Sequence, residues 1–239
     1  IVAESAAGAL SLVSGDGTTV ALAAMPSGYY QAFIPGRQFV TSGTPKDLSG
    51  NSADAVLASS QTDAALWANN GYMTTAAGAN LGVSILAAKS QINLAAESFI
   101  FSVLMNKAAP VGSENVFGAA QAGAGQGFYI SVRATSGAVR PVFVTAVDNV
   151  TGLADSAVAF ADATDHVLTL MYDAYTKLAY LYRDGALVNT YTTTLTPVTG
   201  TSVPVNPFAL GASAVLTGVA CKFSGVHLMK MTGGLPPNY

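Results

Sequence analysis

The chain of 239 residues is long enough to bury a hydrophobic core without disulfide or metal cross-links, and its single cysteine excludes an intrachain disulfide framework. Charged residues make up only 10% of it, against about 25% in an ordinary soluble domain, and the ten Lys and Arg residues form no cluster, which argues against a nucleic-acid partner. Hydrophobic residues reach 51%, but the absence of an uninterrupted apolar run of about 18 residues predicts no membrane span.

The apolar content is largely alanine and valine, interleaved with glycine, serine and threonine. A surface of this composition solubilises weakly and packs closely, which is typical of a protein held against neighbours over much of its exterior. An extracellular β-protein that needs no charge repulsion explains the composition equally well.

Residues 1–36 differ in pattern from the rest of the chain. Two short apolar runs, 9–13 and 18–22, flank a Gly-Asp-Gly turn, and this pattern predicts a hairpin. Because an isolated two-stranded hairpin is marginal in water, we expect residues 1–36 to form an N-terminal arm or edge hairpin that packs on the main body or on another subunit.

From residue 37 onward, short runs rich in branched and aromatic residues alternate with Gly, Asn and Ser clusters, without helical periodicity. This rhythm predicts an all-β sandwich or barrel. The predicted strands lie near 38–42, 54–58, 81–86, 98–106, 115–119, 127–133, 138–146, 157–160, 166–172, 178–183, 186–192, 207–211 and 221–231.

The segment 166–192 is the most informative stretch. It predicts a three-stranded meander, with Asp184-Gly185 supplying the positive φ of a tight hairpin turn. Leu168, Leu170 and Tyr172 alternate onto one face of its first strand. The opposite face is also largely apolar, so we expect this strand to lie centrally and to be covered on both sides.

Several motifs occur in the order found in one family. They are Asp47-Leu-Ser-Gly-Asn51, Leu94–Ser102, Gly127–Val132, Asp165–Asp173, Leu181–Gly185, Phe208–Gly211 and Phe223–Leu228. Together they resemble the concanavalin A-like, LamG-type jelly rolls. The resemblance implies a two-sheet antiparallel jelly-roll sandwich over residues 37–239. Arg183 departs from the family, where valine is usual, and we expect it at a sheet edge or paired with an acid because an unpaired buried arginine is costly.

Some relatives of that fold are β-glucanases, which carry the acids of their catalytic pair as Glu-x-Asp-x-x-Glu on one strand. Here none of the three glutamates, Glu4, Glu97 and Glu114, is followed by an acid two or three residues later. The sequence therefore predicts a protein that is not an enzyme.

Asp162, Asp165 and His166 form the compact acid–imidazole cluster of the chain. Such a group could bind a metal or move a proton, or His166 could be a structural residue that caps a neighbouring backbone group. His227 reads as an ordinary strand residue, and Cys221 as a buried thiol acting as a small hydrophobe.

Calcium is common in lectin relatives of this fold, and Asp47, Asn51 and Asp54 are the candidate ligands here. A turn capped by these side chains explains them at least as well. No other cofactor is expected.

Sugar-binding modules present aromatic rings beside amide or acid groups. Trp67, Asn69, Asn70 and Tyr72 combine an indole, two amides and a phenol in one predicted loop, and are the candidate ligand-binding residues. The alternative is that Trp67 caps the end of the sandwich.

These observations lead to two hypotheses. The first is a non-enzymatic structural and adhesive module of a virion, such as a tail fibre, spike or capsid decoration, which is a homo-oligomer packed against neighbouring subunits and binds host-surface glycans. The second is a secreted, extracellular bacterial carbohydrate-binding module that depends on Trp67.

Overall fold

The computed structural model describes the backbone of the strands between residues 2 and 85, the single positions 47, 62 and 64, and then residues 92, 94, 96–118, 127–146, 149–193, 208–210 and 220–232. Within this part of the chain the strands are β1 (Val2–Glu4), β2 (Leu10–Val13), β3 (Thr19–Ala21), β4 (Tyr30–Ile34), β5 (Ala55–Leu57), β6 (Met73–Thr75), β7 (Val83–Ile85), β8 (Glu97–Asn106), β9 (Glu114–Gly118), β10 (Gly127–Val132), β11 (Val139–Ala146), β12 (Asn149–Gly152), β13 (Asp165–Asp173), β14 (Leu178–Arg183), β15 (Ala186–Thr192), β16 (Phe208–Leu210) and β17 (Cys221–Thr232). No helix among the described residues is long and apolar enough to cross a membrane.

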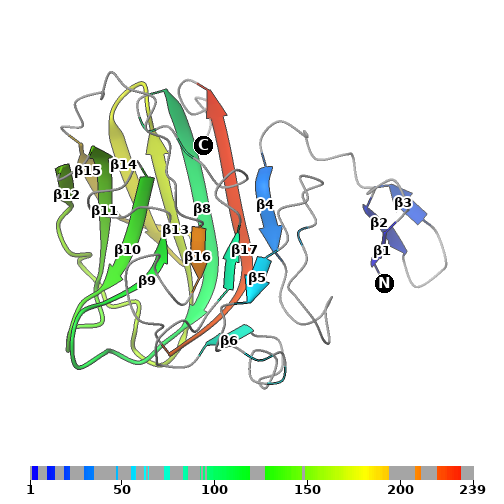
Figure 1. The fold of residues 1–239 in the computed structure, drawn as a ribbon, viewed down its shortest axis with the longest axis horizontal. Coiled ribbons are helices and arrows are strands. Elements are labelled where there is room, and N and C mark those ends of the chain that lie inside the picture. The colour runs from blue at the N-terminus through cyan, green and yellow to red at the C-terminus, as the bar shows by residue number, and fades with distance from the viewer. Residues whose placement is uncertain are drawn as a thin grey trace.

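Two seven-stranded antiparallel sheets form the body of the molecule (Figure 1). The first, which we call the β11 sheet, has the order β12-β11-β10-β9-β16-β7-β5. The second, the β13 sheet, has the order β15-β14-β13-β8-β17-β4, with β6 also paired to β17. The predicted all-β, two-sheet antiparallel sandwich is confirmed.

Aromatic side chains join the two sheets. Phe99 of β8 stacks on Phe128 of β10 with ring centroids 4.4 Å apart and an angle of 11° between the planes. Tyr172 of β13 and Phe143 of β11 meet across the same interface at 5.3 Å. All four rings are fully buried. Offset stacking and large apolar area make such rings dominant contributors to a core.

The β13 strand lies between β14 and β8, as predicted for a central strand. Leu168, Leu170 and Tyr172 are completely buried in the core, which confirms their predicted face. The prediction that both faces are covered is wrong near the start of the strand, where Val167 is 39% exposed. Apolar composition of the outer face therefore does not imply burial there.

Strands absent from the sequence prediction include β4, β6 and β12. β4 lies within residues 1–36 and pairs with β17 of the sandwich, with Ile34 opposite Val226. β12 pairs with β11, although the sequence around Asn149 predicts a turn. The predicted strand at 38–42 falls outside the described residues.

The predicted strand at 157–160 is wrong. This segment has one isolated bridge, between Ala138 and Ala159. It is held instead by Ser156, whose hydroxyl accepts from the Val139 amide at 2.9 Å and donates to the Val158 carbonyl at 2.6 Å. Side-chain bonds of this kind offer the backbone an alternative to a ladder.

The predicted N-terminal hairpin pairs as expected, with Leu12 of β2 opposite Val20 of β3. β1 adds a third strand, and the three form a sheet separate from the sandwich (Figure 1). The division into an arm at 1–36 and a sandwich domain at 37–239 stays a prediction.

The thiol of Cys221 lies at the start of β17 and is 3% exposed, which confirms the buried position expected for it. Burial raises the pKa of this thiol to about 12. At neutral pH the group is therefore a thiol and not the nucleophilic thiolate.

Candidate functional site

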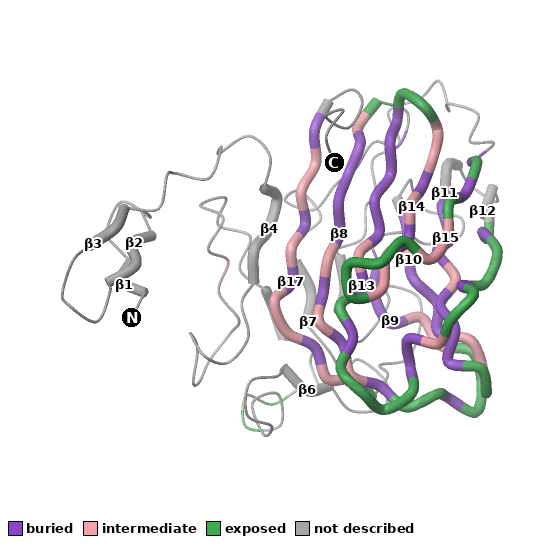
Figure 2. Tube along the Cα trace, turned by 180° about the vertical axis from the view of Figure 1, so that it is seen from behind, coloured by how far each residue is buried: buried purple, intermediate pink, exposed green. Residues whose placement is uncertain are grey.

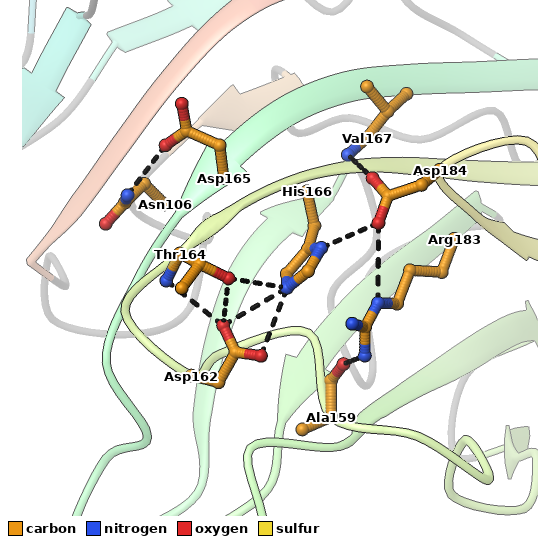
Figure 3. A network of polar contacts seen from close by, with 9 residues as sticks. All are labelled: Asn106, Ala159, Asp162, Thr164, Asp165, His166, Val167, Arg183 and Asp184. Atoms are coloured by element: carbon orange, nitrogen blue, oxygen red, sulfur yellow. Dashed lines mark hydrogen bonds and ion pairs between the residues drawn. The ribbon is translucent and has the colours of Figure 1, made fainter.

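The acid–imidazole cluster gathers where β13 begins and where the β14–β15 turn returns to it (Figure 3). The loop that precedes β13 brings Asp162 and Thr164, and the turn brings Asp184. His166 projects between them and its side chain is only 7% exposed. Asp165 is not a member, because it accepts a hydrogen bond from the Asn106 amide at 2.7 Å instead.

Both ring nitrogens of His166 contact carboxylates. Nδ1 lies 2.7 Å from Asp184 Oδ2, and Nε2 lies 3.1 Å from each oxygen of Asp162. Thr164 Oγ1 is 2.9 Å from the same Nε2 and donates to Asp162 Oδ1 at 2.6 Å. A doubly protonated ring would donate to both carboxylates at once. We call these four residues the His166 clasp.

The turn residue Asp184 also fixes the backbone. Its φ of 53°, followed by 80° at Gly185, is the paired positive φ that a two-residue hairpin turn requires. Its Oδ1 accepts from the Val167 amide at 2.8 Å, and its own amide donates to the Val167 carbonyl at 2.9 Å. One side chain therefore ties the turn to both the side chain and the backbone at the start of β13.

The clasp keeps its acids ionised. Hydrogen bonds from the Thr164 hydroxyl and from His166 hold the pKa of Asp162 well below its ordinary value. Burial alone would raise the pKa of Asp184, but hydrogen bonds from the Val167 amide and His166 outweigh it and the net shift is downward.

The expectation that Arg183 pairs with an acid is confirmed. Its Nε lies 3.5 Å from Asp184 Oδ2, and one of its terminal nitrogens donates to the Ala159 carbonyl at 2.5 Å. The expectation that His166 caps a backbone group is wrong, since its ring binds side chains, and Asp184 makes the backbone contact in its place.

Connected in order, Thr164, His166 and Asp184 have the hydroxyl–imidazole–carboxylate arrangement of a nucleophilic triad. The chemistry of a triad needs a ring nitrogen free to accept the hydroxyl proton. Here Asp162 occupies that nitrogen and also accepts the Thr164 proton. The arrangement therefore locks the hydroxyl and does not activate it.

Asp162 and Asp184 do not form a glycosidase pair either. Such a pair requires one carboxyl with a raised pKa to act as proton donor, and space between the two for a sugar or water. Both pKa values are lowered, and the imidazole of His166 fills the space between the carboxylates. Within the described residues, no group of three or more His, Cys, Asp or Glu side chains is arranged to hold a metal ion.

Sequence reasoning missed Thr164 and Asp184. Thr164 could have been found, because Asp162, Thr164 and His166 alternate in the sequence and alternate residues of an extended segment point to the same side. Asp184 showed only as a turn residue, because its partner His166 stands 18 positions earlier.

The other candidate residues stay predictions. Trp67, Asn69, Asn70 and Tyr72 lie outside the described residues, as do Asn51 and Asp54. Asp47 is described and is half-buried. His227 lies within β17, and burial lowers its pKa.

Neither a known protein-family model nor a curated protein matches the sequence. Among solved structures, the chain is similar to Trypanosoma rangeli sialidase, with a TM-score of 0.59 and 13% identity over 95% of this chain and 33% of the sialidase. It is also similar to the botulinum neurotoxin serotype D binding domain, with a TM-score of 0.59 and 10% identity over 90% of this chain and 50% of that chain.

A third similar structure is a botulinum neurotoxin type C chain, described as dependent for cell entry on two ganglioside molecules, with a TM-score of 0.55 and 11% identity. The likeness covers 86% of this chain and 48% of the toxin chain. The chain thus spans about a third of the sialidase and about half of the toxin chains. At these identities the likeness shows a shared β-sandwich fold.

Proposed function

We propose that this protein is a non-enzymatic binding module that attaches to neighbouring subunits of an assembly and recognises glycans. The main support for glycan binding is the sandwich shared with toxin binding domains, one of which is described through its interaction with gangliosides. The closed His166 clasp supports the absence of catalysis, since its acids are ionised and its imidazole is engaged on both nitrogens.

We assign the module to a virion, as a tail fibre, spike or capsid decoration, because a surface with so few charges suits close packing against neighbours. A secreted extracellular carbohydrate-binding module is the second candidate, favoured by the aromatic and amide residues around Trp67. The first is a homo-oligomer and the second is soluble as a single chain, so size-exclusion chromatography with light scattering separates them.

Glycan binding is tested on an array with the full chain, with Trp67→Ala as the variant. Binding to at least one glycan class is expected, and an array without signal would contradict the proposal. Release of a fluorogenic leaving group from sialosides or β-glucosides would contradict the non-enzymatic part.

Calcium at Asp47, Asn51 and Asp54 is an addition to this proposal. Glycan binding measured with EDTA and then with restored Ca²⁺ tests it, with Asp54→Asn as the matched variant. Binding unchanged by EDTA removes the metal from the proposal.

A further inference from the structure

The outer face of the β13 sheet carries two cross-strand rows of side chains opposite the core. The members of each row lie opposite one another on adjacent strands. Their neighbours along β8 and β13 point to the other face and are buried in the core. The first row is Leu187, Tyr182, Thr169 and Ser102, and the second is Thr190, Tyr180, Met171 and Ile100.

The two rows contain no charged side chain. The acids of β13 lie at the two ends of this strand, outside both rows. Asp165 accepts a hydrogen bond from the Asn106 side-chain amide, and Asp173 accepts one from the Tyr175 backbone amide. On β17 the first row meets His227, opposite Ser102, and burial lowers the pKa of this imidazole, which favours its uncharged form. The first row is rich in hydroxyl groups and the second is mostly apolar.

The rows are accessible in part. Leu187 is 54% exposed and Tyr180 and Tyr182 are half-buried, whereas Met171 and Ile100 of the second row are buried, at 6% and 7% exposed. Along β8, which is buried over most of its length in Figure 2, Ser102 is half-buried and Ile100 is buried. Ser102 Oγ and Thr169 Oγ1 are 2.9 Å apart, so one hydroxyl proton and several lone pairs of this pair remain for another partner.

We infer that the first row, together with Tyr180 and Thr190 of the second, forms a binding surface for a neutral glycan. A sugar ring offers apolar C–H faces that stack on a phenol ring, and hydroxyls that pair with Tyr, Thr and Ser oxygens. An acidic sugar finds no counter-charge in either row. The inference rests on the proposed function and names the surface and the sugar class.

The His166 clasp gives this surface a fixed geometry. Asp184 follows Tyr182 by two positions and is bonded to Val167, which precedes Thr169 by two. The Tyr182–Thr169 pair therefore lies next to a pinned turn, which limits the conformational freedom that a ligand would have to remove.

The test uses the full chain on an array of neutral and acidic glycans, followed by titration of the best neutral binder. Tyr182→Ala is expected to weaken binding about tenfold, the loss of one stacked ring. Tyr182→Phe keeps the ring, so a smaller loss is expected. Tyr175→Ala is the matched control, because that tyrosine is 85% exposed on the β13–β14 turn and lies outside both rows.

Leu187→Lys is a second probe that does not depend on a core position. It places a charge at the exposed end of the first row and is expected to weaken neutral-glycan binding while the melting temperature stays unchanged. Binding that is lost in Trp67→Ala but kept in the Tyr182 and Leu187 variants overturns the inference and leaves the proposed function intact.

Two further outcomes also count against the inference. Exclusive binding of acidic glycans overturns it. Dissociation of an oligomer by Leu187→Lys with unchanged glycan binding makes the surface a contact between copies of the chain, and overturns it as well. An array without any signal removes the inference together with the proposed function.

Discussion

The two sheets share one core but differ in what they present outward. On the β11 sheet, Arg140 stands between the buried Val139 and Pro141, and its Nε lies 2.6 Å from Asp155 Oδ1. Arg133 reaches the same carboxylate oxygen at 3.4 Å. On the β13 sheet the middle rows carry no charge, and charged groups lie toward the ends of the strands, in the His166 clasp at one end and in the Lys230–Glu97 pair at the other.

This difference is informative because the chain has so few charges. Arg133 and Arg140 share the carboxylate of Asp155, and all three side chains stay partly accessible to water, whereas the imidazole of the clasp is almost completely enclosed. An exposed ion pair stabilises little, and a buried one is costly to break. The accessible ion pairs therefore contribute little to the stability of the β11 sheet, whereas the enclosed imidazole and the carboxylates bonded to it fix the start of β13.

The hairpin turns of the two sheets give the largest expected contrast. Gly137, in the β10–β11 turn, has a φ of 65°, and a methyl group there would overlap the Ala161 carbonyl oxygen. Gly137→Ala should cost about 3 kcal/mol of unfolding free energy, since backbone strain alone costs about 1–3 kcal/mol. Denaturant unfolding measures it.

Gly185→Ala is the matched control, with a φ of 80° and open space around the added methyl. It should cost about 1 kcal/mol. Equal losses in the two variants would show that crowding at Gly137 contributes nothing.

Breaking the clasp comes next. His166→Ala leaves the carboxylates of Asp162 and Asp184 facing one another without the imidazole that binds them both. We expect a loss of about 2–3 kcal/mol, below the about 3–5 typical of a fully buried pair, because both carboxylates keep contact with solvent.

The control for the clasp is His227→Ala, which removes the other histidine of the chain. If both variants lose the same free energy in thermal and denaturant unfolding, the carboxylate contacts of His166 add no stability.

The dependence of the unfolding free energy on pH, at its acid end, tests the same clasp. The folded pKa of Asp184 is below its unfolded value, so its contribution is fully present above about pH 4 and is lost as the pH falls through the folded value. We expect about 1 kcal/mol less stability at the acid end, because the group is half exposed. Asp184→Asn should flatten this part of the curve, and an unchanged acid limb would contradict the assignment.

The smallest effect is expected on the charged face. Arg140→Ala should change the unfolding free energy by less than about 1 kcal/mol, since the side chains of both partners are more than a third exposed. Unfolding at low and high salt checks this, because a screened pair loses what little it contributes as the ionic strength rises. A loss as large as that of His166→Ala would erase the distinction between the two faces.

The β13, β14 and β15 strands were predictable because their signals are local. Leu168, Leu170 and Tyr172 alternate as a half-buried strand requires, and Asp184-Gly185 is a strong hairpin signal. β12 was not predictable, since Asn149 has the character of a turn residue and becomes a strand residue only through its pairing with Ala146 of β11.

The clasp was predictable only in part. Asp162 and His166 stand close together in the sequence, so their contact is a local expectation. Asp184 joins them because the β13–β14–β15 meander returns the chain to the start of β13, and this depends on register. The uncharged rows escaped prediction for the same reason, since Tyr182 and Thr169 become neighbours only once the strands pair.

The enclosed sulfur of Cys221 has a practical consequence. It is the sole thiol in the chain, so an alkylating reagent has one target, and that target is shielded while β17 stays in place. The rate of modification would then follow the opening of this strand, so alkylation of Cys221 would report how often each variant opens locally.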